Sequence, residues 1–538
     1  MFSYILSPLH LFDTDNDAAG RPDEQPDDRR GTSAMNVPHR SRGPGKLMTT
    51  ALAAVIAVAG CGTGTGHSQA SGTGPTGTGS THEQQGRDAT APGASASAGA
   101  DGSQDVRFTV GYAGDVLMHM PVLSSTPGAS GDITDNVAAE TPWVESLDLA
   151  LCGMEVPVAP DGVYSGFPTF GTSSEVVGAL ARSGWDGCAT ASNHSADRGE
   201  AGVVATLDAL DAHGLGHAGT YRSREDASAP FALYELERQG RTVTVAQIST
   251  TMGLNGLDDP TGYSVSLNDV GAITKAAKSA RAAGADLVVV HSQLGQEYET
   301  TPDEEQVSYA QALANSGQVD IFFGAHPHVP QPAEKLSGGV KGKGMWASYS
   351  AGNYISSQNE SYCGPLSDVG QLVWADVTSH ADGSVSVESL NWHPFTVDQA
   401  GGYKVRDLAA LHNGERPADL TLSEQEIDRR WSMLTSDVKD ASTMATKPPA
   451  PSGPTPTILS REEVIKRARA HPAPSDGPSA PSSAGSTPRS NREPDRTSPT
   501  SSDRASSKSL NPTPSAAETA QPKAESDEPE GTMEDGEG

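Results

Sequence analysis

Polar side chains that can bind a metal follow several short apolar runs of this sequence. Asp115 and Glu155 supply carboxylates, and the later candidates are an amide and several imidazoles. In chain order the candidates are Asp115, Glu155, Asn193, His194, His291 or Gln293, His326 and His328. This mixed nitrogen and oxygen set suits Mn, Fe or Zn better than Ca or Mg, which prefer oxygen.

Each of these residues alone is a weak signal. A Gly-Asp pair after a strand is usually a turn, and an isolated histidine is usually a core or surface residue. The element His326-Pro-His328 is more specific, because proline fixes its own φ between the two imidazoles. We expect both rings to point to similar sides of an extended segment.

The elements that must position these residues alternate between strand and helix. Strands are expected at 106–113, 147–152, 185–191, 242–248, 287–290 and 319–323. Helices are expected at 174–183, 199–213, 270–283 and 304–315, and further strands at 345–350, 370–377 and 385–392. This order predicts an α/β fold with crossover helices and an antiparallel closing part. In such a sheet the carboxyl ends of the strands share one edge, where the polar candidates would meet.

The ends of the chain differ in composition from the middle. Basic residues precede an apolar run at 47–58, too short to span a bilayer, and Ala59-Gly60-Cys61 follows it. This resembles a bacterial lipobox with Cys61 as the lipidated residue; a plain secretory signal is the alternative. We expect an overlong or disordered start at 1–34, a lipoprotein signal at 35–61, and a flexible linker at 62–104. The folded domain is expected at 105–400, a helical extension at 401–445, and a disordered Pro/Ser/Thr-rich tail at 446–538.

Two local features of the ends and the core remain open. Ser460 and Glu463 have the spacing of a capping box and predict a short helix, for which the sequence shows no partner core. Cys152 and Cys188 lie in apolar runs that read as neighbouring strands, so a disulfide and two buried thiols are equally compatible with the sequence.

Charge excludes one class of partner. The 538 residues include 68 Asp and Glu but only 37 Lys and Arg, which gives a formal charge of −31. A nucleic-acid-binding protein needs clustered basic residues, and the sequence shows no basic stripe. We therefore expect no nucleic-acid partner.

Six segments in order resemble the poly-γ-glutamate capsule-synthesis (CapA-like) family. They are Gly114-Asp115-Val-Leu-Met118, Met154-Glu155-Val-Pro157, Ser192-Asn193-His194-Ser-Ala-Asp197-Arg-Gly199, Gly295-Gln-Glu297-Tyr298, Gly324-Ala-His326-Pro-His328 and Ser348-Tyr-Ser350-Ala-Gly-Asn353. The resemblance implies a calcineurin-like metallophosphoesterase fold, a four-layer sandwich of two β-sheets flanked by helices. The implied metal ligands are Asp115, Glu155, Asn193, His326 and His328. The implied catalytic residues are His194, as general acid, and Asp197.

The sequence also departs from that superfamily's pattern. Leu117 stands where an imidazole is usual, Glu155 replaces an aspartate, and Gln293 replaces another imidazole. His291 lies two residues earlier and could substitute from the same strand face. We therefore expect one well-formed metal site, or one with a weak second ion.

The resemblance implies a role in synthesis, export or attachment of poly-γ-glutamate or another capsule polymer. The expected protein is a metal-dependent hydrolase or transferase, lipid-anchored on the outer face of the cell membrane, acting on an anionic exopolymer or a phosphoester. Two alternatives remain: a non-catalytic polymer-binding component on a degraded scaffold, and a generic extracytoplasmic phosphoesterase.

Overall fold

The computed structural model describes residues 104–438 and 441–472. The predicted start at 1–34, the signal at 35–61 with Cys61, and the tail beyond residue 472 lie outside these residues, as does all of the linker except its last residue. Within the described ranges, none of the helices combines the length and the apolar character needed to cross a membrane.

The first sheet has nine strands, and its central part is parallel. The path runs β14-β13-β12-β1-β2-β3-β4, with β11 added to β1 and β15 to β13. The bounds are β1 Val106–Val116, β2 Leu149–Met154, β3 Gly187–Ala189, β4 Gly216–Ala218, β11 Asn353–Ile355, β12 Val369–Ser379, β13 Val385–Asp398, β14 Lys404–Asp407 and β15 Thr443–Met444. Strands β1 to β4 pair in parallel, whereas β12 joins β1 antiparallel and continues into the antiparallel part.

The second sheet has seven strands in the order β16-β5-β6-β7-β8-β10-β9. The bounds are β5 Ala232–Arg238, β6 Arg241–Thr251, β7 Leu287–Gln293, β8 Ile321–Ala325, β9 Ala333–Leu336, β10 Met345–Ser348 and β16 Thr457–Ile458. Strands β6, β7, β8 and β10 are parallel. They are buried on both faces, which explains the continuous apolar run at 287–290.

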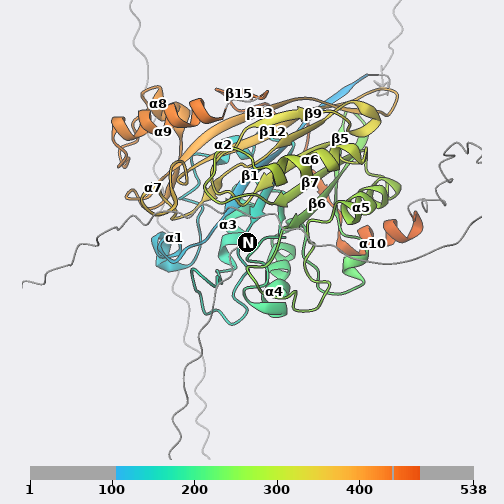
Figure 1. Cartoon of the computed structure of the whole chain (residues 1–538), viewed down its shortest axis with the longest axis horizontal. Helices are drawn as coiled ribbons and strands as arrows, with labels where there is room; N and C mark the ends of the chain where they lie inside the picture. Colours follow the sequence, from blue (N-terminus) through green and yellow to red (C-terminus); the bar gives the residue numbers. More distant parts are fainter. Residues whose placement is uncertain (1–103, 439–440, 473–538) are drawn as a thin grey trace, which may run out of the picture. The chain divides into compact units, whose positions relative to one another are not determined.

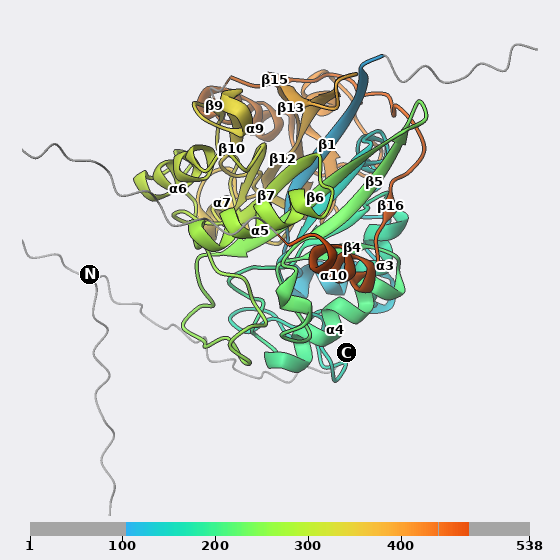
Figure 2. The same cartoon turned by 90° about the vertical axis from the view of Figure 1, so that its right-hand side faces the viewer.

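Three apolar clusters show that the two sheets and their helices form four layers (Figures 1 and 2). Between the sheets, Tyr112 and Leu149 of the first pack with Val245 and Phe323 of the second. One outer cluster joins the first sheet to α1 Met120–Ser125, α2 Thr141–Val144, α3 Glu175–Arg182 and α4 Gly199–Ala212. The other joins the second sheet to α5 Val270–Ala282, α6 Glu304–Asn315 and α10 Arg461–Ala470. The predicted four-layer α/β sandwich is confirmed.

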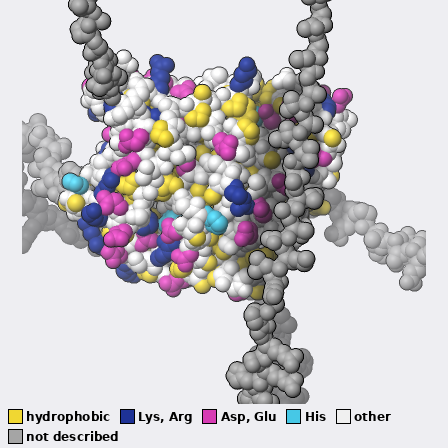
Figure 3. Space-filling model, turned by 180° about the vertical axis from the view of Figure 1, so that it is seen from behind, with side chains coloured by type: hydrophobic (Ala, Val, Ile, Leu, Met, Phe, Trp, Pro, Cys, Tyr) yellow, Lys and Arg dark blue, Asp and Glu magenta, His cyan; other side chains and the backbone are white. Residues whose placement is uncertain are grey.

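Three further helices lie in the C-terminal half: α7 Glu360–Cys363, α8 Leu408–His412 and α9 Glu424–Asp437. Apolar residues of α8 and α9 join the cluster between the sheets. On the face seen in Figure 3, acidic and basic side chains are interspersed.

The first strand is longer than the sequence indicated, with a consequence for the site. β1 continues to Val116, so Asp115 lies inside its last pairs rather than after its end. Gly114 permits this extension, because a Cβ there would lie 1.7 Å from the carbonyl oxygen of Gly352. The close approach brings β11 alongside β1 and pairs Asp115 with Asn353.

The structure differs from the expectation of a tail that begins at residue 446. β16 pairs antiparallel with β5, and α10 is capped by Ser460, whose hydroxyl accepts a hydrogen bond from the Glu463 backbone amide at 3.3 Å. The predicted helix is therefore present. The expectation that it has no partner core is wrong, because Val464 is fully buried in the cluster on the second sheet.

Candidate metal centre

Strand ends from both sheets supply the candidate residues. Asp115 lies near the end of β1 and Glu155 directly follows β2. Asn193 and His194 lie in the turn between β3 and α4. The second sheet contributes residues from β7 and from the turn after β8; they are His291, Gln293, His326 and His328. The predicted convergence at one edge arises because the central strands of each sheet are parallel.

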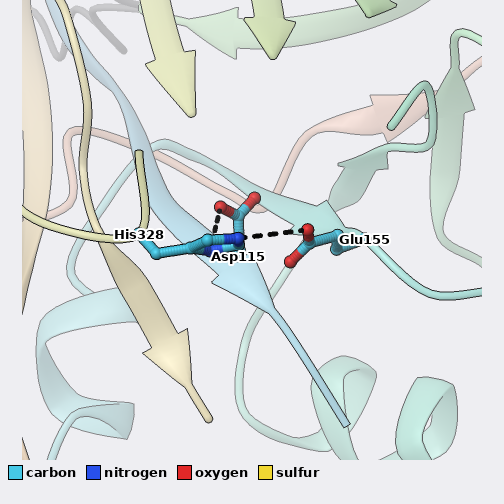
Figure 4. Close-up of side chains that lie close together, drawn as sticks. All are labelled: Asp115, Glu155 and His328. Carbon is cyan, nitrogen blue, oxygen red and sulfur yellow. Dashed lines mark ion pairs between the residues drawn. The ribbon is translucent and has the colours of Figure 1, made fainter. Parts of the chain in front are cut away.

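Asp115, Glu155 and His328 form the closest group, shown in Figure 4. One potential ligand atom from each lies within 4.8 Å of the other two. His328 Nδ1 is 3.4 Å from Asp115 Oδ2, and His328 Nε2 is 3.7 Å from Glu155 Oε1. All three side chains are buried. Two carboxylates and one imidazole at this spacing suit a divalent transition metal.

The turn that carries the two histidines is not extended as predicted. His326 has φ 96° and His328 has φ 59°, both in the left-handed region. Their ring centroids are 6.0 Å apart. The turn lets the His326 amide donate to Asp115 Oδ2 at 3.3 Å while the His328 ring enters the centre. Proline alone did not determine the direction of the two rings, because both neighbours adopt positive φ.

Several buried polar atoms of the centre have no hydrogen-bond partner among the described residues. They are both carboxylate oxygens of Glu155, both ring nitrogens of His291, Asn193 Oδ1 and His326 Nδ1. Such atoms are rare in folded proteins, because an unpaired buried polar group is costly. All are ligand-type atoms, so the residues present fit a bound cation, with Asn193 and His326 as further ligands to the closest group.

The charges of this centre also favour a cation. Burial would lower the pKa of His328, but the charges of Glu155 and Asp115 outweigh burial and raise it to about 10. Burial and the neighbouring Asp115 raise the pKa of Glu155 to about 7, although His328 opposes this shift. The two carboxylates thus create a negative potential that needs a positive partner.

His194 and Asp197 lie beside the group as a hydrogen-bonded pair. His194 Nδ1 is 2.8 Å from Asp197 Oδ2, which also accepts a hydrogen bond from the Phe170 amide at 2.7 Å. Burial lowers the pKa of His194, but the hydrogen bond to Asp197 and the charge of Glu155 outweigh it and raise the pKa overall. The imidazole is therefore held in a fixed orientation and inclined to keep a proton.

His291 and Gln293 lie next to the group of Asp115, Glu155 and His328, but neither belongs to it. His291 packs at a tilt against Tyr112 and Phe323, with ring centroids 4.7 and 5.6 Å away, and burial lowers its pKa to about 3. It lines the same cavity as Asp115 and Glu155. Gln293 donates from Nε2 to Asp115 Oδ1 at 3.1 Å and accepts from the Asn193 amide at 2.9 Å.

Two further residues take part in the site without having been assigned a role from the sequence. Asn353 Oδ1 lies 3.0 Å from His328 Nδ1. Asn255 lies 3.4 Å from both Asn193 and His194. Asn353 belongs to one of the six segments that resemble the CapA-like family. Asn255 lies in the loop after β6, outside all six segments.

Cys152 and Cys188 are joined by a disulfide. They are direct partners in the register of the parallel strands β2 and β3. The disulfide therefore ties together the two strands that lead to Glu155 and Asn193, and resolves the choice that the sequence left open.

Part of the chain is similar in sequence to known bacterial proteins. Residues 109–358 match the model of a family described as "Bacterial capsule synthesis protein PGA_cap". The "PGA biosynthesis protein CapA" of Bacillus subtilis is 30% identical over 31% of this chain, and the "Capsule biosynthesis protein CapA" of Bacillus anthracis is 27% identical over 34%. The chain spans less than half of these relatives, 42% and 43% of their lengths.

The similarity to solved structures is more distant. The calcineurin-like phosphoesterase YfkN of Bacillus subtilis is 14% identical, with a TM-score of 0.36 over 62% of this chain and 98% of that one. The NAD nucleotidase of Haemophilus influenzae is 11% identical, with a TM-score of 0.35 over 68% of this chain and 60% of that one. On the matched segment 109–358 and the two curated relatives, this chain is similar to the bacterial capsule synthesis proteins of the CapA-like family.

Proposed function

We propose that this chain is a metal-dependent hydrolase or transferase that acts on an anionic capsule polymer of the poly-γ-glutamate type. The observation that carries the proposal is the group Asp115, Glu155 and His328 with the pair His194–Asp197 beside it. The names of the relatives, which refer to PGA and capsule biosynthesis, support the substrate class.

Asp115, Glu155 and His328 would hold the metal ion, together with Asn193 and His326. A bound transition metal lowers the pKa of water toward ~7 and polarises a phosphoryl or carbonyl oxygen. Mn, Fe and Zn all suit this ligand set.

His194 would act as the general acid in this mechanism. Its Nδ1 is held by Asp197, which leaves Nε2 to carry a proton to the departing nitrogen or oxygen. Phe170 packs edge-on against the His194 ring with centroids 4.7 Å apart. Asp197 thus fixes the orientation of the imidazole and favours the protonated form that the step requires.

The test is turnover by the purified chain with added Mn²⁺ or Zn²⁺. We expect cleavage of γ-linked polyglutamate, lost in His328→Ala and after chelation, and retained in the control His412→Ala, which changes a histidine on α8 away from the site. Metal-dependent cleavage of a phosphodiester but not of the polymer would favour a general phosphoesterase.

A non-catalytic polymer-binding component is the second candidate. Leu117 favours it, because this side chain packs in the apolar cluster on the first sheet and offers no ligand atom. Polymer binding without turnover, unaffected by His194→Ala, would support this candidate and contradict the enzyme.

We further propose that the protein acts outside the cytoplasm and is lipid-anchored at Cys61. The support is the apolar run ending in Ala-Gly-Cys and the capsule role of the named relatives. Membrane fractionation of cells that express the chain with Cys61→Ser tests the anchor. Release of the variant from the membrane is expected, and unchanged retention would contradict the proposal.

A further inference from the structure

Gln293 ties together the two segments that supply the first and third candidate ligands. It is the last residue of β7, and its side chain is buried. The backbone N–H of Asn193 can only donate a hydrogen bond. The side-chain atom of Gln293 that faces it must therefore be the oxygen, Oε1. The nitrogen end must then face Asp115, where it donates to Oδ1 at 3.1 Å.

This orientation determines which atoms remain for a cation. Nε2 of Gln293 is a donor and has no lone pair to offer a metal. It donates a hydrogen bond to Oδ1 of Asp115. The other oxygen, Oδ2, accepts a hydrogen bond from the backbone N–H of His326 and lies 3.4 Å from Nδ1 of His328. Within the described part of the chain, one group of three acidic, cysteine or histidine side chains meets the spacing for an ion, namely Asp115, Glu155 and His328.

A second ion beside the first would need acceptors on the Asn193 side of the centre. The unpartnered atoms of Glu155, Asn193 and His326 are those already assigned to the first ion. Gln293 bridges Asn193 and Asp115, so a cation next to Asp115 Oδ1 would meet the N–H donor of Gln293 instead of a lone pair. From this we propose that Gln293 limits the centre to one metal ion and acts as a positioning residue for Asp115. The inference rests on the proposed metal centre.

The informative variant is Gln293→Glu, which keeps the length of the side chain but replaces the donor with an acceptor. One carboxylate oxygen would keep the bond from the Asn193 amide, and the other would face Asp115 Oδ1. Two carboxylates at this distance repel each other unless they share a proton or a cation, and a divalent cation in excess competes with the proton. We expect this variant to bind a second ion.

The measurement is the number of Mn²⁺ ions per chain, by elemental analysis and by titration calorimetry on the full chain. One ion is expected in the wild type and two in Gln293→Glu. The control Gln425→Glu adds the same charge on an exposed position of α9 and should bind one. Two ions in the wild type, or one in Gln293→Glu, would overturn the inference.

If Gln293→Glu fails to fold, the variant Gln293→Met tests whether Gln293 positions Asp115 for the metal ion. It removes both hydrogen bonds without adding charge, so it should still bind one ion with an affinity about 10-fold or more weaker, as for other residues that orient ligands. Unchanged affinity would overturn the positioning role. A wild type that binds no Mn²⁺ would contradict the metal centre itself, whereas a wild type that cleaves polymer with two ions would contradict only this inference.

Discussion

The substitution Asp197→Asn tests the assignment of His194 as the general acid. Asp197 Oδ2 accepts hydrogen bonds both from the Phe170 amide at 2.7 Å and from His194 Nδ1 at 2.8 Å. An asparagine oxygen at the same place can keep both contacts, so the neighbouring loop should stay folded. The substitution removes the negative charge that favours protonated His194.

The expected size of the effect follows from the loss of a charged partner. A hydrogen bond to a charged group contributes about 1.5–3 kcal/mol, which corresponds to roughly 10- to 150-fold in rate if it acts only in the transition state. The effect should depend on the leaving group. A substrate that releases p-nitrophenolate needs little help from an acid, whereas a poor leaving group in the polymer depends on protonation.

The assay compares kcat/KM of wild type and Asp197→Asn on an activated phosphodiester and on γ-linked polymer, at equal metal occupancy. We expect a large loss on the polymer and a small one on the activated substrate, with His194→Ala showing the same contrast more strongly. An equal loss on both substrates would refute the general-acid role and indicate a purely structural pair.

Three predictions concern stability. Reducing the disulfide between Cys152 and Cys188, which are 36 residues apart, should lower the free energy of unfolding by about 4 kcal/mol, and an unchanged urea midpoint would contradict its structural role. Burial raises the pKa of Asp186 from 3.8 to about 7, so the folded state keeps a proton that the unfolded state releases. The free energy of unfolding of the wild type should therefore fall relative to that of Asp186→Asn as the pH rises from about 4 to about 7. An equal pH dependence of the two free energies would contradict this. Val464→Ala on α10 should lower the free energy of unfolding by roughly 1–3 kcal/mol, whereas no change would indicate that α10 does not pack on the core.

Much of the fold and several site residues were predictable because they depend on local patterns. The apolar runs before Glu155 and Asn193 and the helical periodicity of α4 and α5 gave the alternation of strands and helices. Parallel strands then place their carboxyl ends at one edge, so the convergence of Asp115 and Glu155 follows from the order of elements.

The rest depends on contacts between distant residues. Asn255 reaches the site through a loop, and β16 finds β5 across more than 200 residues, so neither leaves a local pattern. The positive φ of His326 and His328 is imposed by the turn that brings His328 to Asp115. Such backbone conformations are uncommon for residues other than glycine and are not readable from the histidines themselves.

The central claim is that Asp115, Glu155 and His328 hold a divalent ion. Anomalous X-ray diffraction at the zinc edge, on crystals grown with Zn²⁺, tests it most directly. The account predicts one strong peak among these three side chains, at about 2.0–2.2 Å from their ligand atoms. A zinc-saturated crystal without a peak at this position would contradict it.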